Sequence, residues 1–240
     1  MMQFQPTPST DPFRPAPQIG SNPMSGLIVN NVRKEYHTPI GRRIILDGIS
    51  FNLTASEKIA VLGRNGAGKS TLIKIIGGAE RPTSGEVMRR FRLSWPIAFG
   101  GGFEAGMSGA DNIRFIARLY GSNEKEVMAF VDDFAELGQQ LLVPVRTYSS
   151  GMRMRLGFGL MLAIDFDCFL IDEVISVGDQ RFHAKCHEEL FVKRRNKAMV
   201  IVSHDGNIVR QFCNRALVLK SGRGRVFEDV DLALKIYQTL

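Results

Sequence analysis

The segment at residues 58–71, KIAVLGRNGAGKST, constrains the fold more than any other part of the chain. Its apolar run at 59–62 predicts a buried strand, and residues 70–76 resume with helical spacing. The turn between them has the spacing G-x-x-x-x-G-K-[ST], which is typical of a phosphate-binding loop between a strand and a helix. In such a loop, backbone N–H groups surround a polyphosphate, and the helix directs its positive end at the same charge. The sequence therefore predicts that the chain binds a nucleoside triphosphate.

The residue types in this loop predict distinct roles. Lys69 is expected to reach the β- and γ-phosphates, and the Ser70 hydroxyl is expected to bind Mg²⁺. An ordinary glycine-rich turn could fit the same spacing, but four fixed positions with the correct flanking elements argue against it. The other predicted nucleotide contacts are Gly63, Arg64, Asn65, Gly66, Ala67, Gly68 and Thr71.

Length and composition limit the class of protein. The 240 residues suit one α/β domain with a small inserted lobe. No apolar run approaches the about 18 residues that a membrane-spanning helix needs. Three cysteines without a C-x-x-C pair favour reduced thiols and a cytosolic location. The formal charge of +7 permits contact with anionic surfaces, but no recognition motif accompanies it, so we expect no nucleic-acid partner.

The order of segments predicts how the chain is divided. Residues 1–25 contain six of the ten prolines and are expected to form a disordered tail, within which Met24 is an alternative start of translation. Residues 26–240 are expected to form one α/β domain. Two strands are predicted before the phosphate loop, and helices with apolar stripes follow it. These helices predict a helical lobe, at about residues 88–165, inserted between two halves of the core.

Three further polar segments follow the helical stripes. Ser149 and Ser150, in the sequence YSSGM, precede a helical run and are good N-cap residues. The apolar segment at 168–171 ends in Asp172 and Glu173. Such a pair can hold the Mg²⁺ shell and orient and deprotonate an attacking water. His204 follows the next apolar strand, where an open parallel sheet gathers ligand contacts, so it is expected to touch a phosphate.

One possible metal site has to be weighed against its geometry. His183, Cys186 and His187 have spacings that place them on one helix face. Three ligands on one turn cannot complete a tetrahedral shell, and no fourth stands out in the sequence. We therefore expect no metal site there.

The order of these motifs resembles the nucleotide-binding subunit of an ATP-binding cassette (ABC) transporter, over about residues 27–240. The resemblance implies an α/β P-loop NTPase core with a mixed sheet, an antiparallel β subdomain and an inserted α-helical subdomain. It also implies ATP and Mg²⁺ as ligands and ATP hydrolysis as the activity. By matching position, the implied roles are Walker A for residues 63–71, signature for Ser149, Ser150 and Gly151, Walker B aspartate for Asp172, catalytic glutamate for Glu173, D-loop for Asp179 and switch histidine for His204. Tyr36 is the expected adenine-stacking aromatic, with His37 as the alternative.

Two departures from the family pattern narrow the resemblance. The usual signature L-S-G-G-Q is replaced by YSSGM, and the loop that normally carries a glutamine has none; alignment places Phe99 or its neighbours there. The segments SWPIAFGGGF, SGADNIRFIARLYG, TYSSGMRMRLGF and IDEVISVGD are most similar to ATPase subunits of capsular polysaccharide exporters. O-antigen and teichoic-acid exporters are near relatives, and they are the alternative reading.

The resemblance also implies partners. In this family the signature contacts the γ-phosphate bound to the other subunit, so a head-to-tail homodimer with two ATP molecules is expected. A separate integral membrane permease is expected to dock between the helical lobe and the core, at a groove lined in part by residues 95–103. The chain would then lie at the cytoplasmic face of the inner membrane, and the complex would handle a polysaccharide. Two rival functions fit the sequence less well. Soluble ABC ATPases usually have two cassettes in one chain or a long coiled coil, and this chain is expected to have neither. A small-molecule kinase would have no use for the segment YSSGM before the acidic strand end.

Overall fold

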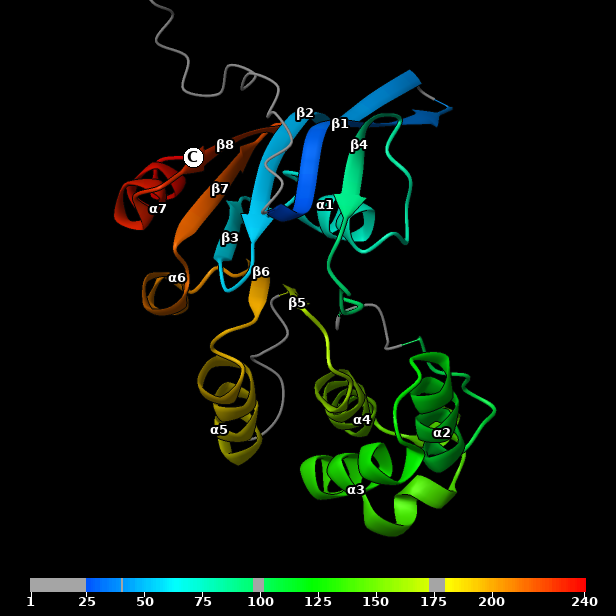
Figure 1. The fold of residues 1–240 in the computed structure, drawn as a ribbon. Helices are drawn as coiled ribbons and strands as arrows, with labels where there is room; N and C mark the ends of the chain where they lie inside the picture. Colours follow the sequence, from blue (N-terminus) through cyan, green and yellow to red (C-terminus); the bar gives the residue numbers. More distant parts are fainter. Residues whose placement is uncertain (1–24, 40, 97–101, 173–179) are drawn as a thin grey trace, which may run out of the picture.

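The computed structural model describes residues 25–39, 41–96, 102–172 and 180–240, and these form two sheets and a set of helices (Figure 1). The smaller sheet is antiparallel and has the strand order β2-β1-β4. Its strands are β1 (Ser25–Thr38), β2 (Gly41–Thr54) and β4 (Ser84–Arg89). The alternating Ile49, Phe51 and Leu53 of β2 are all buried, as the period of two predicts.

The larger sheet has the order β5-β6-β3-β7-β8. Four of its strands run parallel and β8 is antiparallel to β7, so the predicted mixed sheet is confirmed. Every residue of β3, β5 and β6 is buried, because both faces of the sheet are covered. The strands are β3 (Lys58–Gly63), β5 (Cys168–Asp172), β6 (Ala198–Val202), β7 (Arg215–Lys220) and β8 (Arg223–Phe227).

The two faces of this sheet belong to different hydrophobic clusters. Ile59 and Val61 of β3 pack with α1 (Lys69–Ile76) and the antiparallel sheet. Ala60 and Leu62 point the other way, into the cluster formed with the remaining helices. This alternation within one short strand places the end of β3, and hence the phosphate loop, between two packed layers.

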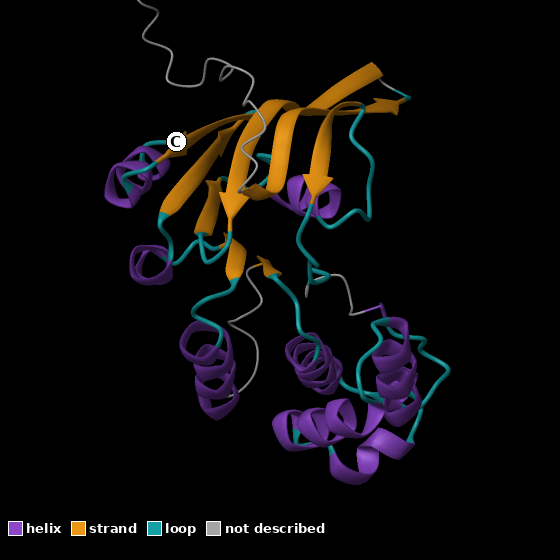
Figure 2. Cartoon of the chain, in the orientation of Figure 1, coloured by secondary structure: helices purple, strands orange, loops and turns teal. Residues whose placement is uncertain are grey.

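A group of helices lies at the end of the molecule opposite the antiparallel sheet (Figures 1 and 2). Its main helices are α2 (Gly109–Leu119), α3 (Glu124–Ala135) and α4 (Ser150–Ala163), with short 3₁₀ turns at Gly138–Leu142 and Val145–Thr147. Asn123 caps α3 by accepting from the N–H groups of Lys125 and Glu126, as its place in the sequence predicts. The apolar stripe of α3 is buried at Val127, Val131 and Phe134.

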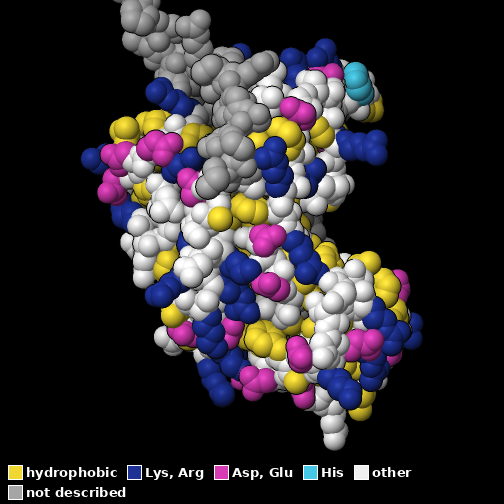
Figure 3. All heavy atoms as spheres, in the orientation of Figure 1, with side chains coloured by type: hydrophobic (Ala, Val, Ile, Leu, Met, Phe, Trp, Pro, Cys, Tyr) yellow, Lys and Arg dark blue, Asp and Glu magenta, His cyan; other side chains and the backbone are white. Residues whose placement is uncertain are grey.

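The last third of the chain alternates helices with the remaining strands. α5 (Gln180–His187) continues into a π-helical turn at Glu188–Lys193, and α6 (Gly206–Phe212) follows β6. α7 (Val230–Gln238) closes the fold and packs on β7. None of the helices in the described residues combines the length and apolar character that crossing a bilayer requires. On the face shown in Figure 3, acidic and basic side chains are interspersed.

Candidate nucleotide-binding site

The phosphate loop leaves no room for larger residues at two of its glycines. Gly68, at the start of α1, has φ 107°, and a Cβ there would lie 2.7 Å from the Leu46 side chain and 2.9 Å from the Ile45 carbonyl oxygen. A Cβ at Gly63 would lie 2.7 Å from the Leu219 carbonyl oxygen. The glycines of the motif are therefore needed by the packing of the loop itself, in addition to any approach of a phosphate.

The ammonium group of Lys69 lies in the middle of this loop. Lys69 is buried, and its Nζ donates to the carbonyl oxygen of Gly63 at 2.6 Å and to that of Arg64 at 3.4 Å. The N-cap residue of α1 is Gly68, which has no side chain to accept from the first N–H groups of the helix, and this N-terminus adjoins the same loop. An ammonium group and the N-terminus of a helix together favour a bound anion.

The loop opens into a cavity of about 580 Å³. Its walls come from three places in the chain: the β1–β2 hairpin, the phosphate loop with α1, and the end of β5. Basic, hydroxyl, aromatic and carboxylate side chains therefore surround one space, as a nucleotide with a polyphosphate tail requires. The lining residues are Tyr36, Thr38, Arg43, Ile45, Asn65, Gly66, Gly68, Lys69, Ser70, Thr71 and Asp172.

Tyr36 is held in place at the wall of this cavity. Its hydroxyl donates to a Glu80 carboxylate oxygen at 2.5 Å, and Lys34 Nζ lies 2.9 Å from the same oxygen and 5.0 Å from the centre of the Tyr36 ring. Burial, followed by the hydrogen bond to Glu80, raises the pKa of Tyr36, so the ring stays neutral. His37 does not line the cavity, because neighbouring residues of a strand point to opposite faces.

Arg43 is a lining residue that the sequence analysis missed. It pairs directly with Tyr36 across the β1–β2 hairpin. Nothing in the local sequence GRRIIL distinguishes Arg43 from Arg42, which instead pairs with Glu35. Only the register of the hairpin shows which arginine faces the cavity.

Ser70 and Asp172 supply the oxygen ligands that a divalent cation prefers. Asp172 ends β5, is only 8% exposed, and lines the cavity together with Ser70. A hydroxyl and a carboxylate are a donor set that fits Mg²⁺. Two other predicted site residues, Glu173 and Asp179, lie outside the described residues.

His204 follows the carboxyl end of β6, as predicted, but it is not among the described residues that line the cavity. Its Nδ1 is hydrogen-bonded to the hydroxyl group of Tyr237 on α7. The two rings are stacked with their centres 6.0 Å apart. The structure therefore places His204 at the correct edge of the sheet and in contact with the last helix.

The Ser149 segment lies apart from the cavity. Ser149 is the N-cap of α4 and accepts from the Met152 N–H at 3.2 Å, and both Ser149 and Ser150 are exposed. With Gly151 they begin a helix that belongs to the opposite end of the molecule from α1 and the antiparallel sheet (Figure 1). None of the three lines the cavity. Within one chain, these serines therefore lie outside the cavity that the phosphate loop lines.

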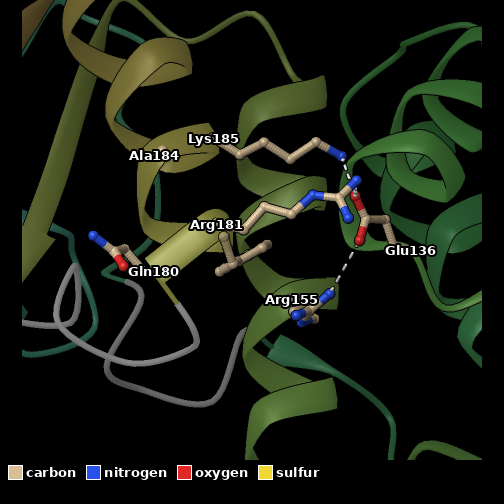
Figure 4. A pocket seen from close by; sticks show the side chains of 7 residues that line it. Glu136, Arg155, Gln180, Arg181, Ala184 and Lys185 are labelled. Carbon is tan, nitrogen blue, oxygen red and sulfur yellow. Dashed lines mark hydrogen bonds and ion pairs between the residues drawn. The ribbon is translucent and has the colours of Figure 1, made fainter.

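A second cavity, of about 640 Å³, lies between α3, α4 and α5 (Figure 4). Lys185 Nζ donates to the carbonyl oxygen of Asp133 and to Glu136 Oε1, both at 2.8 Å. Arg155 and Arg181 also approach the Glu136 carboxylate, at 3.6 Å and 3.5 Å. Cations at the last turn of a helix stabilise its carbonyl groups, so this cluster has a structural explanation as the cap of α3.

The possible metal ligands on α5 are poorly suited to bind a cation. Cys186 is 2% exposed, and burial raises the pKa of its thiol to about 12, which disfavours the thiolate that a metal requires. In the part of the chain that the structure describes, no group of three or more His, Cys, Asp or Glu side chains is arranged to hold a metal ion.

Comparison with known families decides the identity of the fold. The ABC transporter family model matches residues 46–176, which is more than half of the chain. The chain belongs to the ABC transporter family. The resemblance inferred from its motifs is confirmed, and so is the α/β P-loop NTPase fold with mixed and antiparallel sheets.

Several curated relatives of this ABC protein match most of its length. It is 51% identical to the capsule polysaccharide export ATP-binding protein CtrD of Neisseria meningitidis serogroup B, over 88% of this chain and 98% of the relative. It is 50% identical to the ATP-binding protein BexA of Haemophilus influenzae, over 87% and 96%. The polysialic acid transport ATP-binding protein KpsT of Escherichia coli is 43% identical, over 80% and 87%.

Solved structures support the same fold. A dimeric post-hydrolysis state of the ATP-binding cassette MJ0796 with ADP and Pi has a TM-score of 0.71 at 22% identity, covering 84% of this chain and 97% of that one. An ATP-binding subunit of an ABC transporter has a TM-score of 0.75 at 21% identity, covering 88% and 92%.

Proposed function

We propose that this chain is the ATP-hydrolysing subunit of an ABC transporter that exports a capsular polysaccharide across the inner membrane. The cavity that combines Lys69, Ser70, Asp172 and Tyr36 carries the ATP-binding part of the proposal. Relatives at 43–51% identity, named for export of capsule polysaccharide or transport of polysialic acid, support the substrate. O-antigen or teichoic-acid export is the alternative for the polymer.

In the proposed mechanism, different residues of the chain bind the adenine, the phosphates and the metal ion of ATP. Tyr36 stacks on the adenine, while Lys69 and the N–H groups at the start of α1 hold the phosphates. Ser70 and Asp172 would hold a Mg²⁺ ion, which when bound neutralises charge on the phosphate oxygens. The other proposed phosphate-loop contacts are Gly63, Arg64, Asn65, Gly66, Ala67, Gly68 and Thr71.

Two further side chains are proposed to act on the reacting end of ATP. Glu173 orients the attacking water and accepts its proton. His204 donates a hydrogen bond to the γ-phosphate, and Asp179 belongs to the loop that faces the second copy. These roles rest on the family pattern and on the sheet edge at which Asp172 ends β5 and His204 follows β6.

The site is proposed to be completed by a second copy of the chain. Ser149, Ser150 and Gly151 begin an exposed helix N-terminus outside the cavity, where they can meet a phosphate held by another copy but not one held by their own chain. Closure of such a head-to-tail dimer would exclude water and surround the γ-phosphate with hydrogen-bond donors.

Transport requires a partner that spans the membrane. We propose that the chain is peripheral at the cytoplasmic face of the inner membrane and docks to an integral membrane permease. The predicted docking groove is lined in part by residues 95–103, of which 97–101 lie outside the described residues. A nucleic-acid partner is not part of the proposal.

Deletion of the gene and complementation with variants tests the function. Wild-type protein should restore polymer at the cell surface, whereas Glu173→Gln should bind ATP, fail to hydrolyse it and leave the lipid-linked polymer inside. Glu228→Gln removes an exposed carboxylate that does not line the cavity, and it should behave as wild type. An intact capsule in the deletion strain would refute capsular export, and loss of a different surface polymer would support the alternative.

A further inference from the structure

The last helix of the chain contacts a residue of the proposed site. The hydroxyl of Tyr237, on α7, is hydrogen-bonded to Nδ1 of His204, and the two rings are stacked at a centre-to-centre distance of 6.0 Å. Thirty-three positions separate these residues, so the contact depends on how α7 packs against the sheet. Nothing in the family motifs accounts for a tyrosine at this position.

The position of β6, the strand before His204, determines which groups lie near the His204 side chain. β6 lies between β5, which ends in Asp172, and β3, which leads into the phosphate loop. Val202 of β6 pairs with Asp172 on one side and with Val61 on the other. His204 therefore emerges between the carboxylate and the phosphate loop, where a change in ring orientation would change which groups its nitrogens can reach.

A neutral imidazole has one donor nitrogen and one acceptor nitrogen. The phenol is the stronger donor of the two partners and the imidazole nitrogen the stronger acceptor, so we expect the Tyr237 hydroxyl to donate to Nδ1. The proton of the ring is then fixed on Nε2. Nε2–H is the form that can donate to a phosphate oxygen, whereas the other tautomer would present a lone pair to it.

We propose that Tyr237 is a positioning residue that fixes the ring orientation and the Nε2–H tautomer of His204. The expected effect on ATP hydrolysis rests on the proposed function, in which His204 is the group that meets the γ-phosphate. Tyr237 itself is not among the described residues that line the cavity.

α7 is anchored well enough to hold such a contact. Asp229 caps its N-terminus by accepting from the Leu232 N–H at 3.0 Å, and Ala233 and Leu234 are buried in the core. The segment after the helix also contacts the phosphate loop, where Arg64 Nη1 donates to the main-chain oxygen of Leu240 at 3.1 Å. The end of the chain thus binds both the loop and the histidine, and it holds the tyrosine hydroxyl at a defined place.

Nuclear magnetic resonance of the imidazole nitrogens tests the positioning directly. The ¹⁵N shifts distinguish a protonated ring nitrogen from an unprotonated one, and His204→Gln identifies which of the four histidines gives each signal. We expect wild-type His204 to be the Nε2–H tautomer, and Tyr237→Phe, which keeps the ring, to give a mixture of tautomers. A purely structural tyrosine would leave these signals unchanged.

Steady-state ATP hydrolysis tests the consequence. Tyr237→Phe should lower kcat on the order of tenfold and leave KM for ATP unchanged, because ATP binding does not involve the hydroxyl. Tyr120→Phe is the matched control, since it removes a hydroxyl from a ring packed against Phe166 and should leave kcat at the wild-type value. An unchanged His204 tautomer or an unchanged kcat in Tyr237→Phe would overturn the positioning role. Lack of ATP hydrolysis by the wild type would overturn the proposed function, and with it the catalytic consequence.

Discussion

At the scale of single residues, the nucleotide cavity depends on side chains that hold one another. Glu80 accepts hydrogen bonds from both Lys34 and Tyr36, at 2.9 Å and 2.5 Å. Burial raises the pKa of the Glu80 carboxyl, but the hydrogen bonds from Lys34 and Tyr36 outweigh it, and the pKa is lowered overall. The ring of Tyr36 is thereby oriented before any ligand arrives, which reduces the entropy lost on binding.

Substitutions at Tyr36 separate its ring from its hydroxyl. Tyr36→Ala should raise the Kd for ATP by about 5–150-fold, because stacking on a base contributes about 1–3 kcal/mol. Tyr36→Phe keeps the ring and loses the hydroxyl's hydrogen bonds with Glu80 and Thr71, so its Kd should stay much closer to wild type. Titration with a fluorescent ATP analogue measures both. His37→Ala is the matched control, and a larger loss for this variant than for Tyr36→Ala would move the stacking role to His37.

At the scale of elements, the ends of helices are joined to distant segments by charged side chains. Arg194, after the π-helical turn, donates to the Leu162 carbonyl oxygen at 2.7 Å, at the last turn of α4. The same guanidinium contacts Glu189 at 2.5 Å, and Lys193 contacts this carboxylate at 2.6 Å. A cation at the last turn of a helix stabilises its terminal carbonyl groups, and Glu189 holds that cation in place.

The Glu189 carboxylate predicts a pH-dependent contribution to stability. Burial raises the pKa of the Glu189 carboxyl, but hydrogen bonds from Lys193 and Arg194 lower this pKa by a larger amount. The net pKa is therefore lower than that of an ordinary glutamate. The stabilisation is therefore present above the unfolded-state pKa of about 4.3, and it is lost as the pH falls through the folded-state value. Glu189→Gln should lower Tm at pH 7 by about 2–4 °C, which corresponds to about 1 kcal/mol.

Thermal unfolding followed by circular dichroism across pH checks this prediction. The Tm curves of wild type and Glu189→Gln should converge only as the pH falls below the lowered folded-state pKa of Glu189, where the carboxylate is protonated in both states. Glu188→Gln, at the exposed neighbouring position, should match wild type throughout. A Tm difference that persists unchanged at pH 3 would show that the carboxylate charge is not the cause.

At the scale of the whole molecule, the two segments proposed to bind phosphate lie in different parts of the fold. The phosphate loop is part of the core beside the antiparallel sheet, whereas Ser149 begins a helix at the other end (Figure 1). Among the described residues, the nearest atom that a Cβ at Gly151 would meet is Ser149 Oγ at 3.8 Å, which leaves room for a side chain there. A carboxylate at that position also suits a helix N-terminus, but it would repel a phosphate from another copy.

Mixing two inactive variants tests this arrangement. Lys69→Ala should weaken ATP binding and Gly151→Asp should block the partner's phosphate, so neither homodimer should hydrolyse ATP. A hybrid dimer has one intact site, formed by the Gly151→Asp chain's loop and the Lys69→Ala chain's signature. With random pairing, the mixture should recover roughly a quarter of wild-type activity. No recovery, with both variants folded by circular dichroism, would place the whole site within one chain.

Sequence reasoning recovered the elements whose patterns are local. The buried strands β3, β5 and β6 and the capped helices α3 and α4 follow from apolar runs and capping residues close by in the chain. Arg43 could not be recognised, because its position depends on hairpin register, and the contact between Tyr237 and His204 depends on packing over a long separation. Roles assigned to Glu173 and Asp179 stay predictions.

The sequence by itself determined the phosphate loop, the strand that leads into it and the membership of the chain in the ABC family, because these depend on residues at fixed short spacings. The tertiary structure decided which polar side chains share the cavity, that Ser149 lies outside it, and that the last helix binds His204. Those contacts join segments from different layers of the fold, and only the packing of buried apolar faces brings such segments together.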